Sequence, residues 1–470
     1  MNKRIKIKVA LVPAALMLAV MQGDEALAVD LRQAIQSALN TSPEINQAVA
    51  NREATEEERR QARGLYGPRI SVEGSAGIRR LENPTRRALG IANDTLYPLE
   101  ADLFAEQVLV DFGRNRAELS RQAARTDAAA YRVEERAEFT ALNVSRSYFD
   151  YLLQERIVAA SQDNLTFHER LVNDLREGVT RGSISIADQQ QAEERLQAAR
   201  VRLTEANEER ENAAIAFHRL AGVPIGDATM PPPVASRLPG NLDSAVDQAR
   251  ASDPRVLEAL ADFDTANYEV NAARAELAPR ISAEGRARIG DDIDGFQGET
   301  QDYLARVVLR WTIFSSGINQ AAVREAQARA RERRFRVDEV ARIAEADIRT
   351  AWNRLESQTQ LVGELEQQSR SADDLLLSYR EQFNVGRRSL LDVLDSQNTR
   401  FNAQVRTETA RMAQLYAQYR VLAASNQLLD ALEIPHPDGA RANNRERFRV
   451  RASTAAEVLP PRNPYGPTAN

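Results

Sequence analysis

Hydrophobic and polar residues alternate in two regions of the chain, and each region begins just after a proline. Apolar or small residues occupy every second position of residues 70–78 and of residues 281–289. A second alternating stretch follows each of them beyond a loop, regularly over residues 303–313 and less regularly over residues 99–112. A period of two is typical of a β-strand with one apolar and one polar face, and proline can open such a strand. The pattern therefore predicts two strand pairs, with strands of roughly 10 to 12 residues.

The hydrophobic period changes to that of an α-helix after each strand pair. Over residues 113–181 and 317–385, apolar residues recur at steps of three and four, and proline is absent. A helix of about 68 residues, at about 1.5 Å per residue, would be on the order of 100 Å long. Such a helix cannot form a compact globule, so its apolar stripe must pack against other helices. The return helices predicted over residues 185–220 and 389–429 are the nearest partners.

The far end of each long helix carries the same turn signature, Gly-x-x-Ser-x-x-Asp. It consists of Gly182, Ser185 and Asp188 in the first half and of Gly386, Ser389 and Asp392 in the second. Glycine permits the left-handed step that ends one helix, and serine caps the next helix with an acidic residue three positions later. The duplicated signature indicates that both helix hairpins end in a similar tip.

The second half of the chain repeats the first. The run Pro-Arg-Ile-Ser-x-Glu-Gly occurs at residues 68–74 and again 211 residues later, at residues 279–285. Matches beyond Gly113 are 204 residues apart, so the connection before it is seven residues longer in the first half and should be a surface loop. In each half, a helix of about 35 residues that ends near Gly67 or Ala278 should precede the strands, because the next proline cannot continue it. Each copy is therefore predicted to be one structural unit.

The two ends of the chain lie outside these repeats. Basic residues, an apolar run over residues 9–20 and small residues at Ala26 and Ala28 indicate a secretory signal peptide that is cleaved after Ala28. The arginine- and proline-rich residues after 434 predict a disordered periplasmic tail, with a role in contacting partners as the alternative. The expected division is a signal peptide at 1–28, a first helix-hairpin-helix repeat at 29–221, a linker at 222–241, a second repeat at 242–434 and the tail at 435–470.

Composition and charge exclude several kinds of function. Removal of the signal peptide would change the net charge from −6 to −8. This argues against a nucleic-acid partner, which needs an excess of Lys and Arg to neutralise phosphates. Cysteine is absent, which excludes disulfides, thiolate metal sites and a lipidated cysteine. The common catalytic and phosphate-binding motifs are also absent, so we expect no enzyme, no cofactor and no metal.

The chain resembles the TolC-like outer-membrane factors of type I secretion and multidrug efflux. The most specific segment is Val-Gly-Arg-Arg-Ser-Leu-Leu-Asp-Val-Leu-Asp at residues 385–395, which is similar to the periplasmic tip of that family, and the resemblance extends over residues 31–432. It implies a mainly α-helical homotrimer with four strands per chain. These would form one twelve-stranded transmembrane β-barrel, continued by a long periplasmic α-helical coiled-coil tunnel. The sequence supports this stoichiometry, since four strands cannot close a barrel around a pore.

The resemblance also implies location, partners and cargo. The protein would be an outer-membrane channel with a large periplasmic portion, embedded in outer-membrane lipid. It would work with a periplasmic adaptor and an inner-membrane ABC or proton-driven transporter, and would pass exported protein or drug cargo. The missing cysteine departs from lipid-anchored efflux channels, and the overall layout is more similar to the type I secretion branch. The alternative is a soluble periplasmic coiled-coil adaptor or scaffold, in which the strand pairs would be small sheets.

The tip provides the candidate gate. Asp392 and Asp395 lie three residues apart on one helix face, so three copies would form a ring of carboxylates at the tunnel mouth. By resemblance, Arg388 and Asp188 match positions that hold the closed tip together, and Phe383 stands where some members have tyrosine. Ordinary helix capping and a solvated surface are the alternative reading of these charges.

Overall fold

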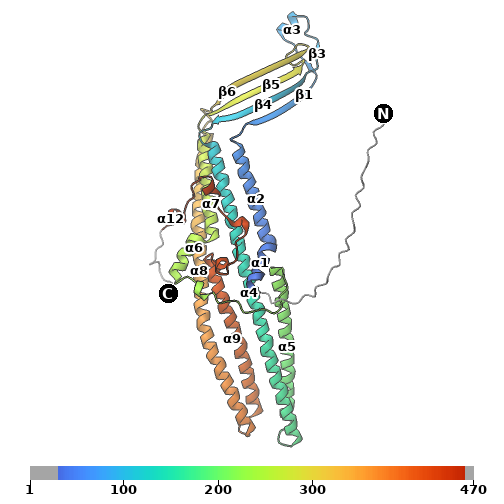
Figure 1. Ribbon diagram of the computed structural model, residues 1–470, viewed down its shortest axis with the longest axis vertical. Helices are drawn as coiled ribbons and strands as arrows, with labels where there is room; N and C mark the ends of the chain where they lie inside the picture. The colour runs from blue at the N-terminus through green and yellow to red at the C-terminus, as the bar shows by residue number, and fades with distance from the viewer. Residues whose placement is uncertain (1–29, 461–470) are drawn as a thin grey trace, which may run out of the picture.

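The computed structural model describes residues 30–460, which form one elongated molecule. A β-sheet lies at one end, and long helices extend away from it to two separate tips (Figure 1). The predicted signal peptide, including Ala26 and Ala28, lies outside the described residues.

The two halves of the chain contain the same succession of main elements. The first half comprises α1 (Leu31–Thr41), α2 (Pro43–Gly64), β1 (Arg69–Ala76), β2 (Arg79–Arg80), α3 (Pro84–Ala88), β3 (Thr95–Leu96), β4 (Leu99–Val110), α4 (Arg114–Thr180) and α5 (Ile186–Ala221). The second comprises η1 (Ala235–Arg237), α6 (Leu242–Ser252), α7 (Pro254–Ala275), β5 (Arg280–Asp291), β6 (Glu299–Arg310), α8 (Ile318–Asn384) and α9 (Leu390–Ala424). Short elements follow: α10 (Leu428–Ala431), η2 (Asp438–Ala440), α11 (Asn444–Arg447) and α12 (Ala455–Val458).

The helix before each strand pair differs from the prediction. A single helix of about 35 residues was expected from the distance between prolines, but two helices stand there, α1 and α2 in the first half and α6 and α7 in the second. Pro43 and Pro254 occupy the first positions of α2 and α7. Proline has no N–H to donate to the preceding turn and restricts the residue before it to an extended conformation, which Ser42 adopts. The prediction of one helix was therefore wrong.

The sheet is antiparallel, with the strand order β1-β4-β5-β6. Its central pair joins the two halves of the chain, since β4 belongs to the first half and β5 to the second. Within the described chain, β1 and β6 each have a neighbour on one side only. Both outer edges of the sheet therefore present backbone groups that can pair with another strand.

The long helices lie side by side as two hairpins. α4 packs along α5, α8 packs along α9, and the hairpins meet where α4 contacts α9. Nearer the sheet, α2 packs on α4, while α7 lies between α4 and α8. The largest core cluster contains the ring pairs Phe149–Tyr419, with centroids 5.1 Å apart, and Tyr148–Phe217, at 5.9 Å. It joins helices from both halves near the middle of the molecule.

The residues after 434 do not form a disordered tail. Residues 435–460 run across the helices between the sheet and the middle of the molecule, in contact with α2, α4, α6 and α7. Val450 and Leu459 are buried, as is Arg445, which forms ion pairs with Asp127 of α4 and Asp264 of α7. The prediction of disorder was wrong for these residues because they find apolar and charged partners that are distant in sequence. Residues 461–470 lie outside the described part of the chain.

Candidate functional site

One face of the sheet carries a network of ion pairs. Alternate residues of each strand point to this face, so the register brings Glu106, Glu284 and Arg306 into one row. Glu284, whose side chain is 2% exposed, accepts hydrogen bonds from Arg310 and from Arg306, the latter at 2.9 Å. The same face holds as many acidic as basic residues: Glu73, Glu100, Asp102, Glu106, Glu284 and Asp302, and Arg69, Arg280, Arg286, Arg288, Arg306 and Arg310. A pore lined by this face would therefore have little net charge in the barrel region.

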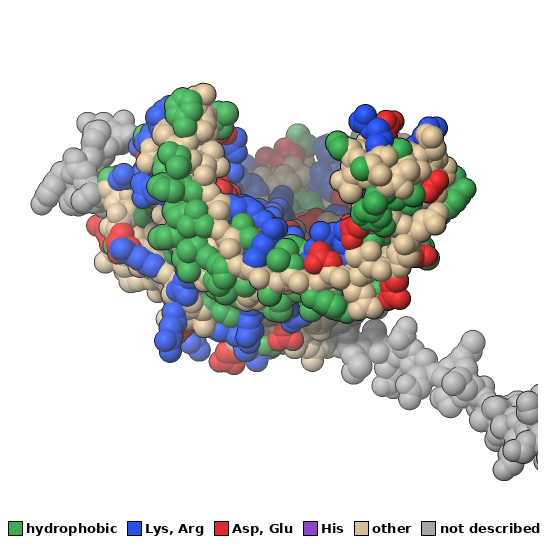
Figure 2. Space-filling view, turned by 90° about the horizontal axis from the view of Figure 1, so that it is seen from above, with side chains coloured by type: hydrophobic (Ala, Val, Ile, Leu, Met, Phe, Trp, Pro, Cys, Tyr) green, Lys and Arg blue, Asp and Glu red, His purple; other side chains and the backbone are tan. Residues whose placement is uncertain are grey.

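The ion pairs also connect neighbouring strands. Arg286 donates to Asp102 at 2.6 Å, and Arg288 donates to Glu100 at 2.5 Å, so β5 is held to β4. Seen from the sheet end, the molecule is hollowed on one side, and charged side chains line this hollow (Figure 2). The Glu284 carboxylate is accommodated there because it pairs with Arg306 and Arg310, whose side chains are about half exposed.

The opposite face of the sheet is apolar and exposed. Val307 and Leu309 are 69% and 60% exposed, and they lie on the face opposite Arg306 and Arg310, as the alternation predicted. Ile313 is also exposed but lies beyond the end of β6, because this strand of 12 residues begins earlier than the alternating stretch, at Glu299, and ends at Arg310. An apolar surface on one side of a long strand and ion pairs on the other are typical of an outer-membrane barrel strand.

The two helix tips have closely similar turns. Gly182 and Gly386 have φ angles of +76° and +74°, which only glycine adopts without steric cost. Ser185 accepts a hydrogen bond from the N–H of Asp188 at 3.0 Å, and Ser389 accepts one from the N–H of Asp392 at 3.3 Å. Each serine hydroxyl also donates to the carboxylate of the same aspartate. The turn residues therefore lie in the helix-capping geometry that the signature describes.

The candidate gate residues all lie at or next to these tips. Arg388 pairs with Asp392 at 3.6 Å, and its guanidinium also stacks on the Tyr379 ring at 4.2 Å. The Ser389 hydroxyl, together with Arg388, holds the pKa of Asp392 below its ordinary value, so this carboxylate is charged at neutral pH. Asp395 is exposed one turn further along α9. A ring built from Asp392 and Asp395 would therefore carry negative charge.

The expected link between the two hairpins is not made by Arg388 and Asp188 within one chain. Among residues 30–460, the charged partner of Arg388 is Asp392 of its own hairpin, and Asp188 interacts with Ser185. Phe383 has no hydroxyl, and it packs on a cluster that includes Leu175, shared by α4, α5 and α9. Hydrophobic contact at this position therefore takes the place of a polar link.

A buried polar layer lies above the tip and was not predicted from the sequence. Ser161, Asn164 and His168 of α4 and Gln397 of α9 are all at most 7% exposed, and Gln397 donates to Asn164 at 2.8 Å. Within residues 30–460, the Asn164 amide nitrogen, the Gln397 amide oxygen and Nδ1 of His168 have no hydrogen-bond partner. Burial lowers the pKa of His168 to about 4, with Arg202 adding to the effect, so its imidazole is neutral at pH 7. The three- and four-residue spacing of these α4 residues on the buried stripe was the signal available.

The described residues contain neither a metal site nor a membrane-crossing helix. No three His, Asp or Glu side chains converge as metal ligands would in residues 30–460. Within the same residues, no helix combines the length and apolarity needed to cross a bilayer.

Comparison with known proteins gives consistent matches along the chain. Residues 34–223 and 245–432 match the family described as outer membrane efflux protein. The outer membrane efflux protein BepC of Brucella suis is 26% identical over 426 residues, which cover 90% of this chain and 89% of BepC. The alkaline protease secretion protein AprF of Pseudomonas aeruginosa is 24% identical, covering 85% and 84%. The crystal structure of the Campylobacter jejuni CmeC outer membrane channel superposes with a TM-score of 0.74 at 15% identity, covering 95% of this chain and 98% of CmeC.

Proposed function

Because this chain belongs to the outer membrane efflux protein family, we propose that it forms the outer-membrane channel of a tripartite export system. The observation that carries the proposal is the sheet, which has an apolar exposed face, a charged opposite face and two unpaired edges within the described chain. A chain in water would not expose such a face, whereas a barrel in lipid needs it.

Three copies would close the barrel. Four strands are too few to surround a pore, and open edges are removed by pairing β1 of one chain with β6 of the next, which gives twelve strands. The helices offer a matching contact, because the outermost helices α5 and α8 expose apolar residues such as Ile215 and Phe335, at 62% and 72%. Side-by-side packing of adjacent copies along these outer faces would cover both. The helices would then continue the barrel as a tunnel on the order of 100 Å long.

The channel would receive cargo from an inner-membrane ABC or proton-driven transporter through a periplasmic adaptor. The balanced charges of the barrel face suit cargo of either sign, so the barrel itself would not select cargo by charge. Similarity to AprF, a protein named for alkaline protease secretion, favours protein cargo of the type I kind. Similarity to BepC, named as an efflux protein, keeps small molecules as the other cargo.

The tip would be the gate. Asp392 and Asp395 of three copies would form six carboxylates at the mouth, which would favour cations. Arg388 and Asp188 would act in contacts between hairpins or between copies, which are individually weak because both side chains are partly exposed. Threefold repetition would keep the tip closed, and an adaptor could still open it.

Planar-bilayer recordings of the purified full-length protein would test the channel and its gate. We expect discrete, cation-selective conductance steps and a trimer band on unheated gels. Arg388→Ser with Asp188→Ala should raise the conductance without lowering trimer yield, whereas Asp392→Ala with Asp395→Ala should weaken cation selectivity. Arg181→Ser, at an exposed arginine of the other tip that pairs only locally with Glu177, is the matched control.

Three results would count against these assignments. A protein that yields no conductance and is recovered only in the soluble periplasmic fraction would contradict the channel and favour the adaptor alternative. Two double variants that conduct and select like the parent would leave the channel intact but remove the gate assignment. A conductance increase in Arg181→Ser equal to that of the gate double variant would show a general loosening of the tip.

A further inference from the structure

Exposed aromatic residues mark the junction between sheet and helices. All four of these side chains are about half exposed or more. They lie in the connections between strands and helices: Tyr66 between α2 and β1, Phe112 between β4 and α4, and Trp311 and Phe314 between β6 and α8. Aromatic side chains of this kind gather where the apolar band of a membrane barrel meets the head groups. The junction therefore corresponds to the periplasmic head-group layer of the outer membrane.

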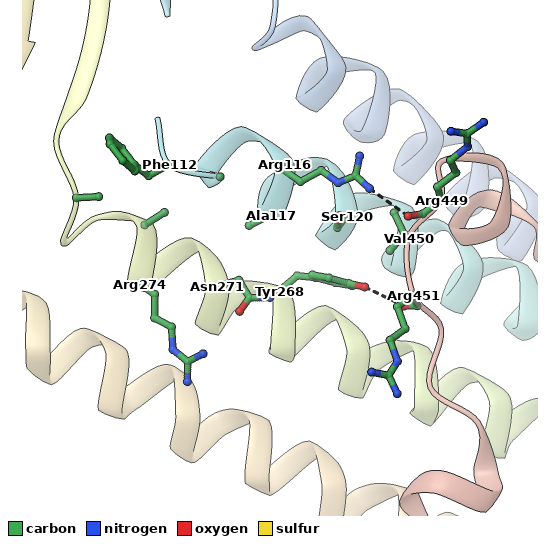
Figure 3. Close-up of a pocket in the computed structure, with 13 residues that line it drawn as sticks. Phe112, Arg116, Ala117, Ser120, Tyr268, Asn271, Arg274, Arg449, Val450 and Arg451 are labelled. Carbon is green, nitrogen blue, oxygen red and sulfur yellow. Dashed lines mark hydrogen bonds between the residues drawn. The ribbon is translucent and has the colours of Figure 1, made fainter. Parts of the chain in front are cut away.

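A cavity of about 420 Å³ opens directly below this aromatic level. It lies between the first turns of α4, the last turns of α7 and residues 449–451 of the C-terminal segment (Figure 3). Phe112 forms its edge towards the sheet, so the cavity is continuous with the aromatic residues of the junction. A groove at this depth is within reach of a lipid head group.

The cavity is lined by cationic and neutral polar side chains. Its thirteen lining residues include Arg116, Arg274, Arg449 and Arg451, together with Tyr268, Ser120 and Asn271, but no aspartate or glutamate. In Figure 3 the Arg116 side chain reaches across the cavity, whereas the guanidinium groups of the other three arginines point away from it. Glu276 pairs with Arg114 at 2.6 Å, outside the cavity lining, and Glu457 pairs with Arg451 of the lining at 3.1 Å. Three of the four lining arginines therefore have no acidic partner among residues 30–460. Asp111 caps α4 by accepting from the N–H groups of Gly113 and Asn115. The cavity therefore has an excess of positive charge.

The arginines differ in how firmly they are held. Arg116 donates to the carbonyl of Arg449 at 3.1 Å, and the Tyr268 hydroxyl donates to the carbonyl of Arg451 at 2.8 Å, so the C-terminal segment forms a stable wall (Figure 3). Among residues 30–460, neither Arg274 nor the guanidinium of Arg449 forms an ion pair. Both guanidinium groups can therefore turn towards an anionic ligand without breaking an existing contact.

We propose that this cavity binds the head group of an anionic phospholipid of the periplasmic leaflet. Arginines below an aromatic belt suit a phosphate group because guanidinium can bind its oxygens through two hydrogen bonds. The acyl chains would continue along the exposed apolar face of the sheet. The proposal depends on the outer-membrane barrel proposed above, and it goes further by assigning a lipid class and three binding sites per trimer.

Tryptophan fluorescence can report on this site. Trp311 donates to the carbonyl of Leu277, and the next residue, Ala278, lines the cavity. The chain has two tryptophans, so Trp352→Phe leaves Trp311 as the single reporter. The full-length trimer would be placed in lipid bilayers of phosphatidylcholine to which brominated phosphatidylglycerol or brominated phosphatidylcholine is added at the same mole fraction. We expect brominated phosphatidylglycerol to quench Trp311 at a lower mole fraction.

Substitutions then separate a site from general charge attraction. Arg116→Gln with Arg274→Gln should reduce the preference for phosphatidylglycerol by about fivefold for each arginine removed. Arg181→Gln with Arg387→Gln removes the same charge at the distant tips and should keep the preference. If the first double variant fails to assemble, Arg274→Gln alone, which breaks no ion pair of the described chain, serves in its place. Channel conductance and trimer yield should remain at parent values, which tests the channel separately from lipid binding.

Several results would overturn the proposal. One is equal quenching of Trp311 by the two brominated lipids in the parent. Another is a loss of preference in Arg181→Gln with Arg387→Gln as large as that in the cavity variant. A third is loss of the preference when inorganic phosphate is added at constant ionic strength, because the occupant would then be a soluble anion. Loss of conductance together with trimer yield in every variant and in the Trp352→Phe parent would instead count against the barrel on which the proposal depends.

Discussion

Arg445 should be the residue that holds the C-terminal segment to the helices. Its Nε donates to Asp127 of α4 at 2.9 Å, and a terminal guanidinium nitrogen donates to Asp264 of α7 at 2.6 Å. The side chains of all three residues are at most 6% exposed. The N–H groups of Asn444 and Arg445 add two bonds to Asp127, and Ser453 adds two to Asp264. The segment is thus attached to both halves of the chain through one cation.

Replacement of Arg445 by Met keeps most of the side-chain volume but leaves two carboxylates buried without their cation. Breaking a buried ion pair in this way typically costs about 3 to 5 kcal/mol. The segment can escape this cost by detaching locally, so its open population should rise by about 100-fold or more. A triple variant removes all three charges together: Asp127→Asn, Asp264→Asn and Arg445→Met. It should keep the segment attached nearly as firmly as in the parent, because no uncompensated charge remains buried.

Trypsin offers a direct assay, since cleavage after Arg449 and Arg451 requires the segment to open. When opening and closing are fast, the cleavage rate follows the open population. We expect Arg445→Met to be cleaved at least about 100-fold faster than the parent, and the triple variant to lie close to the parent. Arg441→Met, which removes an exposed arginine of the same segment, is the control. A rate for Arg445→Met within threefold of this control would show that Arg445 does not hold the segment in place.

Three further predictions concern the sheet, a buried acid and the polar layer. Leu309 lies on the apolar face only two residues from Trp311, so Leu309→Arg should cost about 0 to 1 kcal/mol, whereas Ala305→Arg on the same face at the middle of β6 should cost about 2 to 4 kcal/mol and reduce trimer yield. Arg310→Leu should leave assembly intact because Arg306 still pairs with Glu284; equal yields of Ala305→Arg and Arg310→Leu would contradict this assignment. Burial raises the pKa of Glu138 to about 8, aided by Glu134 and Asp430. The folded protein therefore binds this proton more tightly than the unfolded chain, and stability should fall as pH rises from about 4.5 to about 8, by an amount on the order of 5 kcal/mol. The thermal stability of the trimer, measured against pH, should fall in this way in the parent but not in Glu138→Gln. If the curves of the two proteins run parallel, Glu138 does not cause the fall. Asn164→Leu should lower the stability of the protein by about 1 to 3 kcal/mol because Gln397 loses its hydrogen-bond partner, while the double variant Asn164→Leu with Gln397→Leu should be about as stable as the parent. If the thermal stabilities of the two single variants and the double variant show no coupling between the positions, the two side chains do not depend on each other.

The strands and the long helices could be predicted because their signals are local. The alternation around residues 281–289 and 303–313 places one side chain per step on each face, and the structure has β5 and β6 there. The steps of three and four over residues 113–181 similarly correspond to α4. The tip turns were readable for the same reason, since Gly386 and Ser389 interact only with residues a few positions away.

The sequence pattern was less informative wherever a partner lies far away in the chain. Asn164 and Gln397 are polar residues on helices that otherwise look solvated, so their burial depends on how α4 and α9 meet. The charged partner of Arg388 also depends on how the hairpins pack. Asp392 of its own hairpin is close, whereas Asp188 belongs to a hairpin whose position the local pattern does not determine.

The C-terminal segment shows most clearly how local pattern and distant contacts differ. Its arginines and prolines resemble a solvated tail when read alone, and its hydrophobic positions follow no helix or strand period. The strands, the long helices and the tips follow from local pattern, because periodicity and capping act over a few neighbouring residues. The order of residues 435–460 instead depends on how distant helices pack together. Assembly of α4 beside α7 brings Asp127 and Asp264 together, and two buried carboxylates there require the cation that Arg445 supplies.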